Sequence, residues 1–199
     1  MEYYCKWGIS ISDSFSVLCG TKQGGVLSPD FFAIYIDDLI KKLRQSGIGC
    51  HIVKQFLACI LFADDLTLIA PTRGSMQQLL NICAEYGRIY CLKFNVSKTN
   101  VMIFGRGSGQ VESLAKLKLE GEDISYVRTC RYLGFHIVSD IKFRFSSTEC
   151  LRSFFGSVNS IMTLLTKPTE SVLMQMLYAN CVPILSYGAA VKDLTSAEK

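Results

Sequence analysis

Residues 56–70 read FLACILFADDLTLIA, and this stretch decides the expected fold. Two apolar segments rich in β-formers flank an adjacent pair of carboxylates, Asp64 and Asp65. Each segment has the length of a strand and is too short for a stable helix, so the stretch predicts a β-hairpin with two acids at its tip. Two ionised carboxylates on a buried sheet repel each other and are costly to desolvate unless a cation lies against them. A divalent metal ion is the expected partner of this pair.

A second pair of adjacent acids, Asp37 and Asp38, lies in a different local pattern. Apolar residues recur three and four positions apart through residues 28–45, which is typical of an amphipathic helix. One or both acids therefore belong to a solvated helix face, where Lys41 and Lys42 are placed to pair with them. The spacing assigns this pair a structural role and leaves Asp64 and Asp65 as the candidate catalytic acids.

The composition describes an ordered globular protein of moderate size. The chain has 199 residues, of which 49% are hydrophobic and 19% charged, and a net charge of +4 permits a nucleic-acid partner without implying one. Its 9 cysteines form no pair with the spacing of zinc ligands, and an odd number fits poorly with a closed disulfide framework. With no secretory signal and no run of about 18 apolar residues, we expect an intracellular protein of the cytoplasm or nucleus, with no membrane segment.

The first half of the chain predicts two further kinds of element. Residues 2–8 and 14–19 are rich in aromatic and β-branched residues and predict a hairpin whose turn lies between them. The helix over residues 28–45 should begin with Ser28 as its N-cap and Pro29 as its first residue. A second amphipathic helix is expected over residues 75–90.

The second half predicts short strands and then helices. A strand at residues 100–104, a hairpin at 117–124 and a strand at 131–138 precede a wholly helical region, which should start at a capping box formed by Ser146 and Glu149. We place a boundary near residue 140, with a mixed part at 1–140 and a helical part at 141–199. The expected class is α+β, an antiparallel sheet with packed helices followed by a helical segment.

Four short motifs follow one another along the chain, with a predicted helix after the first and the predicted hairpin around the second. They are QGGVLSP at 23–29, FADD at 62–65, Asn95-x-x-Lys98-Thr99, and YLG at 132–134. In this order they resemble four successive motifs of reverse transcriptases of non-LTR retrotransposons. The resemblance covers about residues 15–140, and the helical tail is similar in type to the thumb that follows the palm in that family.

The resemblance implies an activity, a cofactor and partners. The family is an RNA-directed DNA polymerase that adds deoxynucleoside triphosphates to a DNA primer on an RNA template. Two Mg²⁺ ions, for which Mn²⁺ can substitute, assist in-line displacement at the α-phosphate. On the resemblance, Asp64 is a direct metal ligand, and Asp65 supports it or binds less directly. Phe62 replaces the tyrosine that is common at its position and packs rather than reacts.

The other motifs carry binding roles in the family. Gln23, Gly24 and Gly25 resemble the loop that contacts the template or the incoming nucleotide, where glycines permit a close approach. Lys98 resembles the lysine that protonates or neutralises the departing pyrophosphate. Residues 132–134 (Tyr132, Leu133 and Gly134) resemble the primer grip. A tight glycine turn, a surface lysine and a half-buried strand explain the same residues without any function.

The chain departs from the family pattern in two respects. The family's other metal-binding aspartate lies on an upstream palm strand, and neither that residue nor the fingers motifs have a counterpart here. We therefore expect the chain alone to be inactive in primer extension and to need the upstream fingers and palm segment of its polyprotein. In addition, Cys91 stands where the family commonly has glycine, which costs on the order of 1 to 2 kcal/mol if that position needs a positive φ.

Three alternatives to a polymerase fragment remain open on the sequence. The first is a non-catalytic truncated remnant that at most binds nucleic acid. The second is a metal-dependent nuclease built on the paired acids. The third is a group II intron enzyme, which would share the palm motifs and is separated only by motif spacing.

Overall fold

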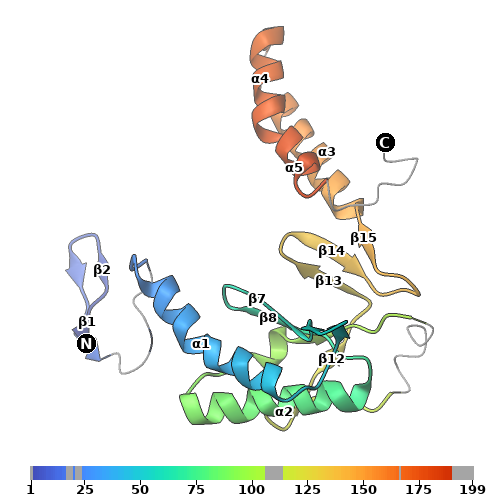
Figure 1. Cartoon of the computed structure of the whole chain (residues 1–199). Helices are drawn as coiled ribbons and strands as arrows, with labels where there is room; N and C mark the ends of the chain where they lie inside the picture. Colours follow the sequence, from blue (N-terminus) through green and yellow to red (C-terminus); the bar gives the residue numbers. More distant parts are fainter. Residues whose placement is uncertain (1, 17–19, 21–23, 106–113, 166, 190–199) are drawn as a thin grey trace. The chain divides into compact units, whose positions relative to one another are not determined.

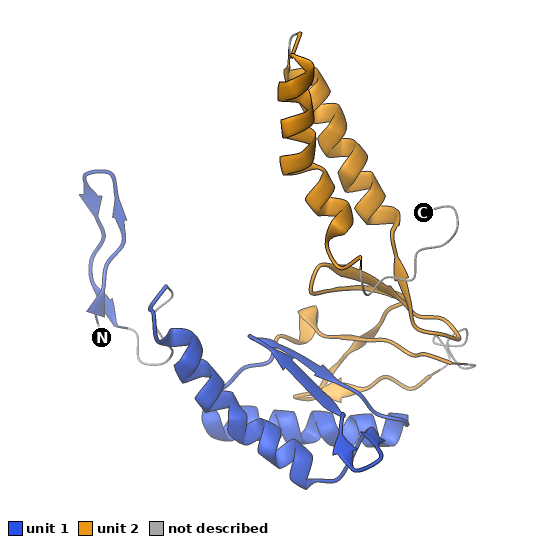
Figure 2. Cartoon of the chain, turned by 45° about the horizontal axis from the view of Figure 1, so that its top comes forward, with its two compact units in different colours: residues 1–94 blue, residues 95–199 orange. Residues whose placement is uncertain are grey.

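The computed structural model describes residues 2–16, 20, 24–105, 114–165 and 167–189 (Figure 1). Contacts divide the chain into two compact units, residues 1–94 and 95–199 (Figure 2). Helices and small, mainly antiparallel sheets occur in both units, which confirms the predicted α+β class. The predicted division near residue 140 concerns the parts of a larger polymerase and remains a prediction.

The chain begins with the expected hairpin, although its turn lies earlier than predicted. Strand β1 (Glu2–Tyr3) pairs with β4 (Phe15–Ser16), and β2 (Lys6–Trp7) pairs with β3 (Ser10–Ile11). The turn follows Trp7 because Gly8 adopts a φ of +60° at little steric cost. The polar residues that predicted the turn instead lie in and after the returning strand.

Two long helices contribute most of the buried core residues of the first unit. Helix α1 (Ser28–Gln45) and helix α2 (Arg73–Tyr90) contact each other. The predicted N-cap of α1 is wrong by one position, because Leu27 is the N-cap and Ser28 is already helical. Helix α2 begins two residues earlier than predicted, since Thr72 and Ser75 form a reciprocal capping box.

The hairpin predicted around the acids is confirmed. After a short hairpin formed by β5 (His51–Ile52) and β6 (Gln55–Phe56), strand β7 (Cys59–Phe62) pairs with β8 (Asp65–Leu68). Alternate residues of the β7–β8 hairpin pack against the core that α1 and α2 form. The buried members of this core are Ile36, Leu39, Leu43, Ala58, Leu79, Cys83 and Tyr86.

Close packing at the base of the hairpin explains why residue 49 is a glycine. Gly49 has a φ of +104°, and a Cβ placed on it would lie 2.2 Å from the Cβ of Ala58. Ala58 is itself fully buried, so neither residue has room to move. The backbone of the hairpin is thus fixed against the helices on the side away from its tip.

The second unit carries three small sheets. Strand β9 (Asn100–Val101) runs parallel to β12 (Ser125–Tyr126), and β10 (Lys118–Leu119) forms the predicted hairpin with β11 (Glu122–Asp123). The third sheet is antiparallel and has the order β13-β14-β15. Its strands are Thr129–Tyr132, Phe135–Val138 and Arg144–Ser146.

The prediction of one continuous strand over residues 131–138 is wrong. The chain turns at Leu133 and Gly134, where φ is +46° and +81°, so the segment forms the β13–β14 hairpin. The resemblance had already placed a strand turn at this motif, whereas the apolar run alone concealed it. Glycine and a positive φ at both loop residues are typical of two-residue hairpin turns.

Three helices that contact one another follow in the described part of the chain: α3 (Thr148–Leu164), α4 (Glu170–Asn180) and α5 (Val182–Ser186). The capping box predicted for Ser146 and Glu149 is wrong, because Ser146 lies in β15 and Ser147 is the N-cap. None of the helices in the described part of the chain combines the length and the hydropathy needed to cross a membrane.

Candidate active site

The candidate catalytic acids lie at the tip of the β7–β8 hairpin. Phe62 pairs with Asp65, so Ala63 and Asp64 form a two-residue loop and Asp65 is the first residue of β8. Ala63 has a φ of +51°, a conformation that costs a non-glycine residue roughly 1 kcal/mol or more. The tight turn fixes the spacing of the two acids along the backbone.

The acids are not buried, which corrects one premise of the sequence argument. Asp64, Asp65 and Phe62 are all exposed, whereas Leu61 and Leu66 beside them are partly buried against the core. Strand alternation explains the exposure of Phe62 and Asp65, because successive side chains point to opposite faces of the hairpin, and Asp64 is exposed in the loop. Water therefore solvates both carboxylates, and no described residue forms an ion pair with either of them.

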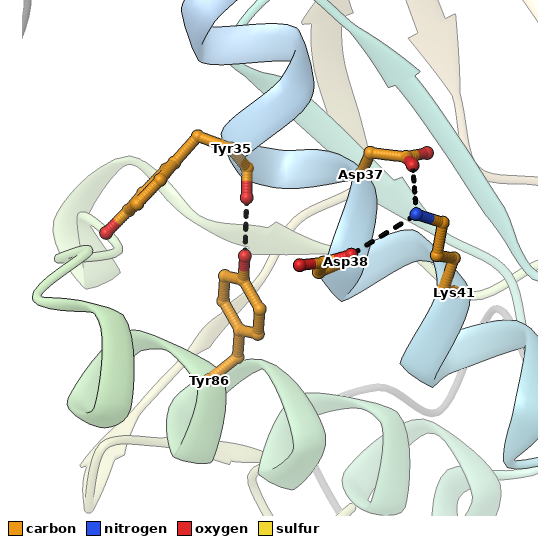
Figure 3. A network of polar contacts seen from close by, with 5 residues as sticks. All are labelled: Tyr35, Asp37, Asp38, Lys41 and Tyr86. Carbon is orange, nitrogen blue, oxygen red and sulfur yellow. Dashed lines mark hydrogen bonds and ion pairs between the residues drawn. The ribbon is translucent and has the colours of Figure 1, made fainter.

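The acids on helix α1 have a structural partner, as the sequence predicts (Figure 3). The ammonium group of Lys41 lies 2.7 Å from a carboxylate oxygen of Asp37 and 3.3 Å from one of Asp38. The hydrogen bonds that Lys41 donates to these two carboxylates, first to Asp37 and then to Asp38, raise the pKa of Lys41. The predicted pairing with Lys42 is not found.

Lys42 instead faces aromatic rings of helix α2. Its Nζ lies 5.5 Å from the ring centres of both Tyr86 and Tyr90, a distance typical of a cation–π contact. Lys41 thus neutralises the helical acids, whereas no described residue forms an ion pair with Asp64 or Asp65.

The two acids at the hairpin tip have the ligand chemistry of a hard divalent cation. Magnesium prefers oxygen ligands and usually takes one or two protein carboxylates, with water and phosphate completing its shell. Asp64 and Asp65 supply two such groups. Within the described ranges, no cluster of three or more His, Cys, Asp or Glu side chains is placed to hold a metal ion.

The glycines of the first motif lie directly before helix α1. Gly24 is exposed with a φ of +77°, and a Cβ placed on it would meet no atom within 4 Å. The carbonyl of Gly25 accepts a hydrogen bond of 3.2 Å from the Ser28 amide, which leads the chain into the helix. Gln23, the third residue of this prediction, lies outside the described residues.

Lys98 occupies a short helical turn that its own motif builds. The 3-10 helix spans Val96–Lys98, and the Asn95 side chain accepts a hydrogen bond of 3.2 Å from the Lys98 amide. The Thr99 hydroxyl donates to the Asn95 carbonyl at 2.8 Å. Asparagine and threonine thus have a local structural reason to flank this lysine, whose side chain is exposed.

The YLG motif forms the end of the β13–β14 hairpin. Tyr132 is the last residue of β13, and Leu133 and Gly134 form the loop. The Tyr132 hydroxyl is buried and has no hydrogen-bond partner among the described residues. The backbone of the loop, rather than this hydroxyl, is therefore the polar surface that the motif offers.

The predicted site residues are divided between the two units. Gly24, Gly25, Phe62, Asp64 and Asp65 belong to the first unit. Lys98 and residues 132–134 belong to the second.

Sequence reasoning missed Tyr187, whose hydroxyl donates a 2.9 Å hydrogen bond to the Leu133 carbonyl. The available signal was an aromatic residue followed by Gly188 within the region predicted to be helical.

Comparison with known proteins follows the same motifs. Residues 3–137 match the family described as "Reverse transcriptase (RNA-dependent DNA polymerase)". This match contains all four motifs and ends one residue before strand β14 does.

Two curated relatives are polyproteins of retrotransposable elements. The Pol polyprotein from element R1 of Bradysia coprophila is 25% identical over 201 residues, covering 95% of this chain and 18% of the relative. The Pol polyprotein from element R2DM of Drosophila melanogaster is 38% identical over 87 residues, which is 44% of this chain and 8% of the relative.

A third relative, the Pol polyprotein from element R2 of Popillia japonica, is 28% identical over 121 residues, covering 58% of this chain and 17% of its own length. The chain therefore spans less than a fifth of the length of each of these three relatives.

Proposed function

The chain belongs to the reverse transcriptase (RNA-dependent DNA polymerase) family, and we propose that it supplies part of the polymerase centre of a non-LTR retrotransposon polyprotein. The activity of the whole protein would be RNA-directed DNA synthesis, in which a primer 3′-hydroxyl attacks the α-phosphate of a deoxynucleoside triphosphate on an RNA template. The chain would contribute the second half of the palm, followed by thumb-like helices.

One observation carries this proposal: the β7–β8 hairpin presents Asp64 and Asp65 to solvent at a tip whose base is packed on two helices. A rigid support matters because nucleotidyl transfer depends mostly on positioning and on stabilising charge. The helical pair Asp37 and Asp38 lacks this character, since Lys41 already pairs with both.

Members of this family depend on divalent metal ions, and the two hairpin acids have the oxygen ligands that Mg²⁺ or Mn²⁺ prefers. We assign Asp64 as the direct ligand and Asp65 as the weaker or supporting one. When bound, two such ions stabilise charge on the attacking and leaving oxygens. A third carboxylate would come from a segment of the polyprotein outside this chain.

The remaining motif residues would bind and orient the substrates. Gln23, Gly24 and Gly25 would lie against the template or nucleotide, where glycine permits a close approach. Phe62 is 59% exposed and offers an aromatic face to a base or sugar. Lys98 would neutralise the negative charge of the leaving pyrophosphate or donate a proton to it.

The β13–β14 loop would hold the primer end. Its backbone groups lie at a tight turn, and Gly134 leaves no side chain on one side of the loop. Nucleic acid is the partner that these roles require, and we expect the protein to act inside the cell.

A complementation assay tests the proposal. The chain alone should not extend a primer on an RNA template, whereas a polypeptide that also contains the upstream fingers and palm segment should. Asp64→Asn should abolish this extension, because it removes a metal-binding charge. Asp37→Asn is the matched control and should retain it.

Two results would contradict the proposal. The first is extension by the longer protein that survives Asp64→Asn. The second is template-directed synthesis by the purified 199-residue chain that vanishes in Asp64→Asn, which would show that no upstream carboxylate is required. Mg²⁺-dependent cleavage of nucleic acid without extension would instead favour a nuclease.

One observation favours a non-catalytic remnant as the second candidate. Cys91 adopts a φ of +54° at the end of helix α2, so a strained residue occupies a position suited to glycine. The remnant hypothesis accounts for this departure from the glycine that the family commonly has at this position. A stop codon directly upstream in the genome would support the remnant, and a palm strand with an aspartate would support the enzyme.

A further inference from the structure

Tyr187 connects the helical segment to the YLG loop within the second unit. It follows helix α5, which lies at the end of the helical segment nearest the β13–β14 hairpin (Figures 1 and 2). Its hydroxyl donates a 2.9 Å hydrogen bond to the Leu133 carbonyl. Its ring stacks on Phe135, with 5.3 Å between ring centres and 28° between planes. One side chain therefore contacts both the loop and the first residue of the returning strand.

Two glycines make this contact possible. A Cβ on Gly134 would lie 2.9 Å from Cε1 of Tyr187, and a Cβ on Gly188 would lie 2.2 Å from the ring of Phe135. Both glycines also have a positive φ, +81° and +68°. Each ring thus fills the space that a side chain on the opposite glycine would need, and the two segments fit each other reciprocally.

The loop has an unfavourable backbone conformation that this contact can stabilise. Leu133 has a φ of +46°, which is unfavourable for a bulky residue. The Tyr187 hydroxyl satisfies the Leu133 carbonyl and holds it in one direction. Helix α5 is in turn tied to α3, since the Cys150 thiol donates to the Ile184 carbonyl at 3.0 Å.

We infer that Tyr187 is a positioning residue that sets the orientation of the loop at Leu133 and Gly134 and transmits the position of helices α3 to α5 to it. This inference rests on the proposed role of the loop in holding the primer end. Primer binding would then be sensitive to the thumb-like helices through one hydrogen bond and one ring stack.

Amide hydrogen exchange of residues 133–135 in the 199-residue chain tests the contact itself. Tyr187→Phe removes the hydrogen bond and keeps the stack, so exchange should accelerate about fivefold. Tyr187→Ala removes both and should accelerate it by more than about tenfold. The exposed Tyr178 on α4 provides the control variant Tyr178→Phe, which should change nothing. Unchanged exchange in both Tyr187 variants would overturn the inference.

A matched glycine pair separates steric contact from backbone strain. Gly121 occupies the same second loop position in the β10–β11 hairpin, with a φ of +87°, but a Cβ there would meet nothing within 4 Å. Gly134→Ala should therefore accelerate exchange in its own loop several-fold more than Gly121→Ala does in its loop. In a Tyr187→Ala background, Gly134→Ala should accelerate exchange no more than Gly121→Ala does in its own loop, because the clashing ring is gone. Equal effects of the two glycine substitutions would contradict the contact.

Binding of an RNA–DNA hybrid distinguishes a positioning role from a purely structural one. The probe is a hybrid whose DNA strand has a recessed 3′ end, compared with a blunt hybrid of the same length. Tyr187→Phe should weaken binding of the recessed hybrid about fivefold and leave the blunt hybrid unchanged. An equal loss of affinity for both hybrids would overturn the positioning role. Unchanged affinity for the recessed hybrid, despite accelerated exchange, would also overturn it.

The two proposals fail separately in these experiments. If the wild-type chain binds both hybrids equally while the Tyr187 variants still accelerate exchange, the contact stands and the primer-binding role of the loop fails. If the wild-type chain prefers the recessed hybrid and Tyr187→Phe retains that preference, the positioning inference fails and the primer-binding role stands.

Discussion

The hydroxyl of Tyr86 on α2 donates a 2.5 Å hydrogen bond to the backbone carbonyl of Tyr35 on α1 (Figure 3). A second link runs the other way, since the Tyr35 hydroxyl donates to the carbonyl of Tyr90. The Tyr86 and Tyr90 rings stack with their centres 4.3 Å apart. The two helices that support the acidic hairpin are thus joined by polar contacts at one end of a largely apolar interface.

Removing the Tyr86 hydroxyl should destabilise the first unit. Tyr86 is only 1% exposed, and Tyr86→Phe would keep its ring while removing a hydrogen bond worth about 1 kcal/mol. Urea denaturation should show a decrease of this size in the free energy of unfolding. Tyr4→Phe is the control, because Tyr4 is 65% exposed. Equal stability of Tyr86→Phe and wild type would show that this hydrogen bond contributes nothing.

Replacing Cys91 with glycine should stabilise the chain. Cys91 ends helix α2 with a φ of +54°, and the following Leu92 amide donates to the Gly87 carbonyl at 2.9 Å. Glycine relieves the steric strain of the left-handed conformation but loses more backbone entropy, so we expect a net gain of about 0.5 to 1 kcal/mol. The melting temperature of Cys91→Gly reports this gain, and Cys5→Gly should show none. A lower melting temperature for Cys91→Gly would mean that the thiol makes a compensating contact.

The buried thiol of Cys83 should make the stability of the first unit sensitive to alkaline pH. Burial, with a smaller contribution from Cys59, raises the pKa of Cys83 from 9.0 to about 12. Because the folded state holds this proton more tightly, the stabilisation is complete below pH 9. It is lost as the pH rises toward 12, by up to about 1.4 kcal/mol per pH unit.

The matched substitution isolates this effect from the other groups that titrate above pH 9. Cys83→Ala should lower stability at pH 8, because it leaves a small cavity, and should also reduce the loss of stability between pH 9 and 10.5. Cys91→Ala, at an exposed position, should keep the wild-type slope. Identical slopes for Cys83→Ala and wild type would contradict a raised pKa at this thiol.

Removing the Tyr132 hydroxyl should stabilise the chain, whereas removing the Tyr86 hydroxyl should destabilise it. The Tyr132 hydroxyl is buried without a partner among the described residues, which is costly. Tyr132→Phe should therefore raise the free energy of unfolding by about 1 kcal/mol and leave the exchange of the neighbouring loop amides unchanged. A destabilised Tyr132→Phe would reveal a hydrogen bond to an ordered water molecule at this site.

The sequence by itself determined the features that depend on near neighbours in the chain. Periodicity separated Asp37 and Asp38, on a helix, from Asp64 and Asp65, on a hairpin, although the two patterns look alike. The turn at Glu120 and Gly121 was also predicted correctly. Such features follow from backbone preferences and side-chain spacing within a few residues, which a single sequence contains.

Only the tertiary structure decided the features that depend on distant contacts. Sequence alone suggested a continuous strand at residues 131–138, but the segment is a hairpin, and its loop accepts a hydrogen bond at the Leu133 carbonyl from Tyr187, 54 positions further along the chain. The hairpin acids were expected on a buried sheet, yet they are exposed because the helices cover only the other face and the base of the hairpin. Burial and long-range hydrogen bonds arise from the packing of whole elements, so no local pattern reports them.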